Sequence, residues 1–157
     1  MIQRIQSLFL FLVFVSGLAT FFFPIASFWG ELDVIRLGAI GVEDLSPSPS
    51  DTEWPNTILL LVVLGLITLM AFVAIFLYKR RKVQVRLIMF GLLLNIIYLA
   101  LIFFYYVPEL EALTQTSADY IREPGIYLPI VSIVFLILAN RFIMKDEKLI
   151  RSADRLR

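Results

Sequence analysis

Four long apolar runs constrain this 157-residue chain more than any other feature of its sequence. Three of them, Leu8–Phe28, Ile58–Tyr78 and Leu87–Val107, are 21 residues long and contain no charged side chain. The fourth, Ile126–Met144, has 19 residues and one charge, Arg141, near enough to its end for the guanidinium to reach the headgroups. A helix of about 20 residues crosses a hydrocarbon core of roughly 30 Å. The runs therefore predict an all-α integral membrane protein, a bundle of four transmembrane helices over 8–28, 58–78, 87–107 and 126–144.

The first run has an alternative interpretation as a cleaved signal peptide. Arg4 precedes it, and Gly17-Leu18-Ala19 loosely resembles a cleavage site. The apolar core of a signal peptide has about 7–15 residues, however, and this run is longer. We therefore expect an uncleaved first helix.

Charged residues are divided unevenly between the segments that separate the runs. Of the 14 Lys and Arg residues, one lies before the first run, five lie in residues 79–86 and six lie from Arg141 onwards, which leaves only Arg36 and Arg122 elsewhere. The loops 29–57 and 108–125 hold ten of the 13 acidic residues. The positive-inside rule places both termini and residues 79–86 in the cytoplasm and these two loops outside, as in a multi-pass protein of a bacterial inner membrane.

The two outer loops give weaker signals. Apolar residues between 32 and 42 alternate with polar residues and glycines, with an interruption at Ile35, so this stretch could form a short β-hairpin or lie on the membrane surface. Residues 46–51, SPSPSD, are typical of an extended spacer. Pro108 and the acidic residues behind it predict the start of a short helix.

The residue types that most catalytic chemistry needs are missing. The chain has no His and no Cys, so the common zinc, haem, iron–sulfur and thiol sites lack ligands. The apolar runs contain no Asp, Glu or Lys, which a proton or ion relay normally needs. The outer carboxylates are scattered through loops and fit a solvated rim better than an acid–base pair. The sequence predicts no enzyme, no cofactor and no nucleic-acid partner.

One strongly polar side chain lies in the middle of a run. Asn95 follows Gly91 by four residues and precedes Tyr98 by three, so all three share one helix face. A carboxamide can bond a neighbouring helix while the glycine allows close approach, an interaction worth about 1–2 kcal/mol or less. The alternative is a polar contact in a substrate or lipid pocket. We favour the interhelical contact, because a single polar residue makes a poor pathway.

The basic segment 79–86 also has two interpretations. It contains Lys79, Arg80, Arg81, Lys82 and Arg86 and no acid. Such a segment sets orientation, and it can also hold anionic lipid headgroups at about 1 kcal/mol per basic residue. Orientation alone suffices to explain it.

The charged tail, residues 145–157, is patterned as a helix. Leu149, Ala153 and Leu156 form one narrow apolar stripe, and charged residues occupy the opposite face. No Pro or Gly follows Pro129, so we expect the fourth helix to continue into the cytoplasm. The stripe is a candidate docking seam for a protein partner.

Three segments resemble a known family: MIQRIQSLFL at the start, YKRRKVQVRL in the centre and ANR…KDEKLIRSADRLR at the end. They are similar to a family of small four-span membrane proteins from Bacteroidota, known only as a domain of unknown function. The resemblance covers the whole chain and implies an inner-membrane protein, but it carries over no functional residue.

Two function classes follow from these observations. We prefer a non-enzymatic interaction or accessory subunit that engages a partner through its tail. The alternative is an oligomeric transporter or channel for small solutes or lipids, in which Asn95 and Thr68 would line a pore.

Overall fold

The computed structural model describes residues 2–29, 34–46, 54–113 and 119–154. Four long helices dominate it: α1 (Ile2–Phe22), α2 (Ile58–Phe76), α3 (Arg81–Leu101) and α5 (Tyr127–Asp154). Each lies in a helical segment that is long and apolar enough to cross a membrane, which indicates a multi-pass membrane protein.

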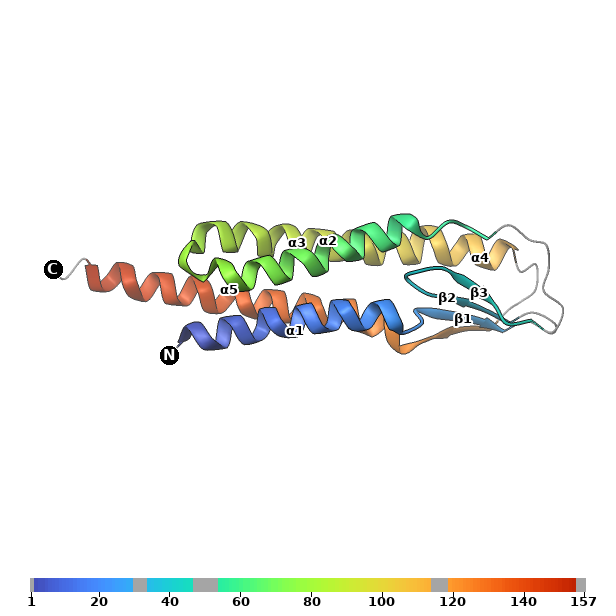
Figure 1. The fold of residues 1–157 in the computed structure, drawn as a ribbon, viewed down its shortest axis with the longest axis horizontal. Coiled ribbons are helices and arrows are strands. Elements are labelled where there is room, and N and C mark those ends of the chain that lie inside the picture. The colour runs from blue at the N-terminus through green and yellow to red at the C-terminus, as the bar shows by residue number, and fades with distance from the viewer. Residues whose placement is uncertain (1, 30–33, 47–53, 114–118, 155–157) are drawn as a thin grey trace.

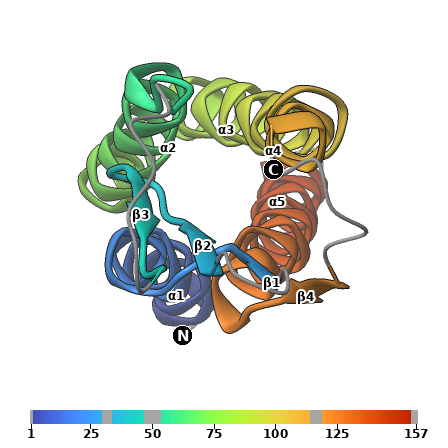
Figure 2. The same ribbon diagram turned by 90° about the vertical axis from the view of Figure 1, so that its right-hand side faces the viewer.

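The four helices form a closed ring. α1 and α3 each pack against both α2 and α5, as the end-on view in Figure 2 shows. Figure 1 shows both chain termini at one end of the bundle, which we call the termini end, and the strands at the other, which we call the sheet end. Short connections between antiparallel neighbours are usual in such bundles.

The first apolar run is shared by two elements, which corrects the helix predicted over 8–28. α1 begins at Ile2 and ends at Phe22, and the rest of the run forms strand β1 (Ala26–Trp29). Pro24 explains the division, because proline lacks an N–H and disfavours helical geometry in the residue before it. The last turn of α1 closes where the Phe23 N–H donates to the Ala19 carbonyl at 3.1 Å.

The third helix is longer than the span predicted over 87–107. α3 continues through a π-helical segment, η2 (Ile102–Tyr106), into α4 (Val107–Leu113), so that helical structure covers 33 residues from Arg81 to Leu113. Pro108 has no N–H for the carbonyl one turn before it, and the wider π-turn relieves the clash of its ring. The helix predicted to start at Pro108 is therefore a continuation of α3.

The chain is mostly helical but not all-α, because its two outer segments build one small sheet. The strands β1, β2 (Val34–Leu37), β3 (Val42–Asp44) and β4 (Asp119–Arg122) are antiparallel in the order β3-β2-β1-β4. The hairpin that the sequence left open is β2–β3. Strand β4, which pairs with β1 from the opposite end of the chain, was not predicted.

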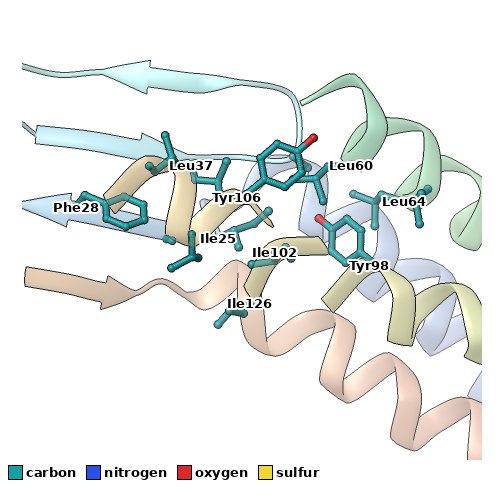
Figure 3. Packing of buried hydrophobic residues seen from close by; sticks show 14 of the residues in the cluster. Ile25, Phe28, Leu37, Leu60, Leu64, Tyr98, Ile102, Tyr106 and Ile126 are labelled. Carbon is teal, nitrogen blue, oxygen red and sulfur yellow. The ribbon is translucent and has the colours of Figure 1, made fainter. Parts of the chain in front are cut away.

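One core joins the sheet to the helices. Phe28 lies opposite Ile35 in the β1–β2 register, and both side chains are buried. Figure 3 shows that the buried side chains of the strands continue into those of α2, α3 and η2, where Tyr98 and Tyr106 are the largest. A second cluster fills the ring nearer the termini end.

A glycine fixes the junction between α1 and α5. The Gly125 N–H donates to the Pro24 carbonyl at 2.8 Å within the short 3₁₀ turn η3 (Pro124–Ile126) that leads into α5. A methyl group on Gly125 would overlap that carbonyl oxygen and lie 2.7 Å from the carbonyl oxygen of Phe23. The backbone of residues 23 and 24 leaves no room for a side chain at this position.

At the termini end the connection between α2 and α3 is much shorter than the predicted loop 79–86. A single 3₁₀ turn, η1 (Leu77–Lys79), follows α2, and α3 begins at Arg81. The N–H groups of Val83 and Gln84 both donate to the Arg80 carbonyl at 3.0 Å, so most of the basic segment lies on the first turns of a helix. α5 continues past Met144, the predicted end of the span, as far as Asp154.

Candidate functional site

Asn95 lies inside the bundle, but its hydrogen bond stays within its own helix. The side chain is 1% exposed, and its Nδ2 donates to the Gly91 carbonyl at 3.1 Å. The structure thus gives a bond within α3 in place of the predicted interhelical bond. Tyr98 is fully buried on the same face, and among the described residues its hydroxyl has no hydrogen-bond partner.

Gly91 does not serve as the close-contact position that the sequence suggested. A Cβ built on Gly91 would meet no atom of another element within 4 Å. A Cβ on Gly17 of α1, in contrast, would lie 2.6 Å from the Thr68 Oγ1 of α2. Sequence reasoning noted Thr68 but did not pair it with Gly17, because the pairing depends on the rotation of both helices.

A serine pair makes the polar contact between helices that was expected of Asn95. The hydroxyl oxygens of Ser16 in α1 and Ser132 in α5 lie 2.6 Å apart, and both side chains are buried. Ser16 Oγ also lies 2.9 Å from the Val13 carbonyl, to which it donates. The sequence gives no signal for this pair beyond the presence of two hydroxyls within apolar runs.

Uncharged amides are buried nearer the termini end, and sequence reasoning missed them. Gln84 is 1% exposed, and its Nε2 donates to the Ala74 carbonyl at 3.0 Å, which ties α3 to α2. Gln84 Oε1 and Gln6 Nε2 are buried without a partner among the described residues. Gln84 could have been found as a polar residue on the same helix face as Ile88 and Gly91.

A salt bridge joins the basic segment to α5. The Arg81 guanidinium lies 3.0 Å from the Asp146 carboxylate, and both side chains are largely shielded from solvent. Arg80, Lys82 and Arg86 are exposed, whereas the side chain of Lys79 lies outside the described residues. Three cations of the segment therefore remain at the surface, and Arg81 holds α5 beside the start of α3.

The predicted docking seam can be placed only in part. Leu149 and Ala153 lie on α5, which runs to Asp154. Their side chains, and Leu156 as a whole, lie outside the described residues.

Between the described parts of the four helices there is little room for a solute. The hollow between the helices, lined by residues such as Leu10, Ile67, Ile88 and Leu136, holds only about 10 Å³. A single water molecule needs about that much space. No group of three or more metal-ligating side chains occurs within the part of the chain that the structure describes. The buried polar groups described above fix contacts within and between the helices.

Comparison with known proteins identifies a family. Residues 2–156 match the family described as "Domain of unknown function (DUF4293)". Neither the curated proteins nor the solved structures contain a match.

Proposed function

The chain belongs to the DUF4293 family, and for this member we propose a non-enzymatic role as an accessory membrane subunit that engages a protein partner through the end of α5. We further propose that it lies in a bacterial inner membrane with both termini in the cytoplasm. The distribution of basic residues supports this orientation. Twelve of the 14 lie before the first apolar run, in residues 79–86 or from Arg141 onwards, the segments that the positive-inside rule places in the cytoplasm.

The observation that carries this proposal is the length of α5. Its 28 residues correspond to about 42 Å, whereas a hydrocarbon core is roughly 30 Å thick. In Figure 1, α5 extends past the start of α1 and past the α2–α3 connection. The Arg81–Asp146 salt bridge fixes α5 at the level of that connection, and eight further helical residues, 147–154, follow.

A projecting helix with one apolar stripe is suited to a partner. Leu149, Ala153 and Leu156 recur at intervals of four and three residues, the spacing of a helix that packs along one seam. The charged residues of the opposite face keep the helix soluble until the partner binds. Exposed salt bridges are worth only about 0–1 kcal/mol each, so the apolar stripe supplies the affinity.

The alternative, an oligomeric conduit, has less support. Thr68 and Asn95 would have to face a pore between copies, but both are buried within one chain. Each donates to a carbonyl of its own helix, Thr68 to Leu64 at 2.8 Å. The outer surface of the ring is apolar instead, as expected for helices that contact lipid.

The test is crosslinking followed by affinity purification of the full chain from native membranes. We expect the double variant Leu149→Ser/Leu156→Ser to insert normally, to keep the wild-type melting temperature and to lose the captured partner. The matched control, Arg151→Ser/Arg155→Ser, changes the opposite face and should keep it. Capture of the same proteins by the wild type and by the Leu149→Ser/Leu156→Ser variant would refute the proposal.

A further inference from the structure

A hollow at the sheet end lies where α1 leaves the bundle. It has a volume of about 430 Å³ and is lined by the end of α1, residues 21–24, and by the β2–β3 hairpin. The hairpin contributes Gly38, Ile40 and Gly41 of its turn, together with Arg36 and Glu43 of its strands. A volume of roughly 300–1,000 Å³ is usual for sites of small ligands.

Arg36 lines this hollow, and its guanidinium has a donor without a partner in the part of the chain that the structure describes. Its Nε is buried and has no hydrogen-bond partner among the described residues. Burial of a charged donor without a partner costs free energy, and a phosphate or carboxylate would satisfy it. Glu43, on the neighbouring strand, lies directly opposite Arg36 in the β2–β3 register. The hollow therefore presents one positive and one negative group side by side.

An apolar groove reaches the same place from the membrane-spanning part of the protein. It lies between α1 and α2, has a volume of about 340 Å³ and is lined by Phe14, Leu18, Phe21, Gly65, Thr68, Leu69 and Phe72. Phe21 lines both the groove and the hollow, so the two adjoin. The rings of Phe14 and Phe72, 5.3 Å apart, bound the groove at its deep end. From Phe14 to Phe21 the groove runs about 10 Å along α1.

The rim of the hollow is suited to the boundary of a bilayer. Phe22, the last residue of α1, is 82% exposed, and Ile40 in the hairpin turn is 65% exposed. Large apolar side chains at this level are unfavourable in water and favourable where acyl chains begin. Such a rim fits a hollow at the depth of the headgroups and a groove at the depth of the acyl chains.

From these features we propose that the sheet end binds one phospholipid whose headgroup carries both a phosphate and an ammonium group, of the phosphatidylethanolamine type. Arg36 binds the phosphate, Glu43 binds the ammonium, and one acyl chain lies in the α1–α2 groove. A purely anionic headgroup would satisfy Arg36 but would leave Glu43 facing a like charge. The site lies at the opposite end of the molecule from the α5 tail and does not depend on the role proposed for that tail.

Gly65 provides a way to block the groove without disturbing its walls. A Cβ at Gly65 would meet no atom within 4 Å, so a larger side chain can extend into the space of the acyl chain. The Thr68 hydroxyl is already bonded to the Leu64 carbonyl, so it does not attract a polar ligand into the groove. The variant Gly65→Leu should thus fill the groove and leave the hollow intact.

The experiment is native mass spectrometry of the delipidated full chain, titrated with phosphatidylethanolamine or phosphatidylglycerol of identical acyl chains. We expect one bound phosphatidylethanolamine per chain and an affinity about tenfold above that for phosphatidylglycerol, since a hydrogen bond to a charged group contributes about that factor. Arg36→Gln and Gly65→Leu should each weaken phosphatidylethanolamine binding about tenfold, and Glu43→Gln should abolish the preference between the two lipids.

Matched controls make the outcome specific. Arg122→Gln changes an exposed arginine of another strand, and Leu66→Phe changes an exposed residue of α2 outside the groove; both should bind as the wild type does. If Gly65→Leu does not fold, Leu69→Trp blocks the same groove from its exposed side. Equal affinity for both lipids, unchanged binding by Arg36→Gln or by the groove variant, or equally tight binding of the water-soluble glycerophosphoethanolamine would each overturn the proposal.

Discussion

The contact between Gly17 and Thr68 gives the sharpest test of how α1 and α2 pack. Gly17 is buried, and a Cβ at this position would lie 2.6 Å from Thr68 Oγ1, well inside van der Waals contact. Thr68 cannot easily turn away, because its hydroxyl donates to the Leu64 carbonyl at 2.8 Å. The substitution Gly17→Ala must therefore push the two helices apart or break that bond.

Two opposing terms set the size of the effect. Overpacking of a close contact costs about 1–3 kcal/mol. Alanine is a better helix former than glycine by up to about 1 kcal/mol, which offsets part of the cost. We expect Gly17→Ala to lower the free energy of unfolding by about 1–2 kcal/mol. Gly91→Ala, where nothing lies within 4 Å of the new methyl group, should leave it unchanged or raise it.

Reversible unfolding in mixed detergent micelles measures this difference. The variant Thr68→Ala removes the hydroxyl and leaves only a Cβ that would lie 3.4 Å from the new methyl group, an ordinary contact. In that background Gly17→Ala should cost nothing, so a double-mutant cycle should return a coupling energy of about 1–2 kcal/mol. Equal stability of Gly17→Ala and Gly91→Ala, or a cycle without coupling, would refute the packing of α1 against α2 described above.

Two further outcomes are expected. Because the chain has no cysteine, single cysteines can report orientation: those at Ser48 and Thr116 should react with an impermeant thiol reagent in intact cells, and one at Ser152 should not. Labelling at Ser152 would contradict the proposed orientation. Ser132→Ala removes the hydroxyl 2.6 Å from that of Ser16 and should lower the free energy of unfolding in micelles by about 0.6 kcal/mol, and at most about 1.7 kcal/mol. No change at all would mean that the pair does not hold α1 to α5.

The number of helices follows from composition, whereas their ends depend on single residues. Each apolar run contains one membrane-length helix, because nothing but a helix satisfies so many backbone groups without water. Hydrophobicity alone does not locate the ends. Pro24 ends α1 although the residues on both sides of it are apolar. Pro108 does not end the third helix, because the wider π-turn of η2 makes room for the proline ring.

The sheet could not be derived from the sequence. Its strands have only three or four residues, too few for an alternation of apolar and polar side chains to be recognised. Most of β1 also lies within the first apolar run, whose length and composition predict a helix. The pairing of Ala26 with Arg122 joins positions far apart in the chain, and no local signal specifies it. Asn95 shows the same limit: its burial could be anticipated from the sequence, but the choice of the Gly91 carbonyl as acceptor is decided by geometry.

The shared core argues that the sheet is part of the bundle and not a separate domain. Four strands of this length do not form a stable sheet alone and need a helical surface to cover one face. Here that surface consists of Tyr98, Ile102 and Tyr106, on the helix that also spans the bundle. The Gly125–Pro24 hydrogen bond fixes the turn η3, which leads into α5, to this assembly, and α5 then runs without a break to Asp154. One uninterrupted helix therefore leads from the sheet end to the proposed docking tail.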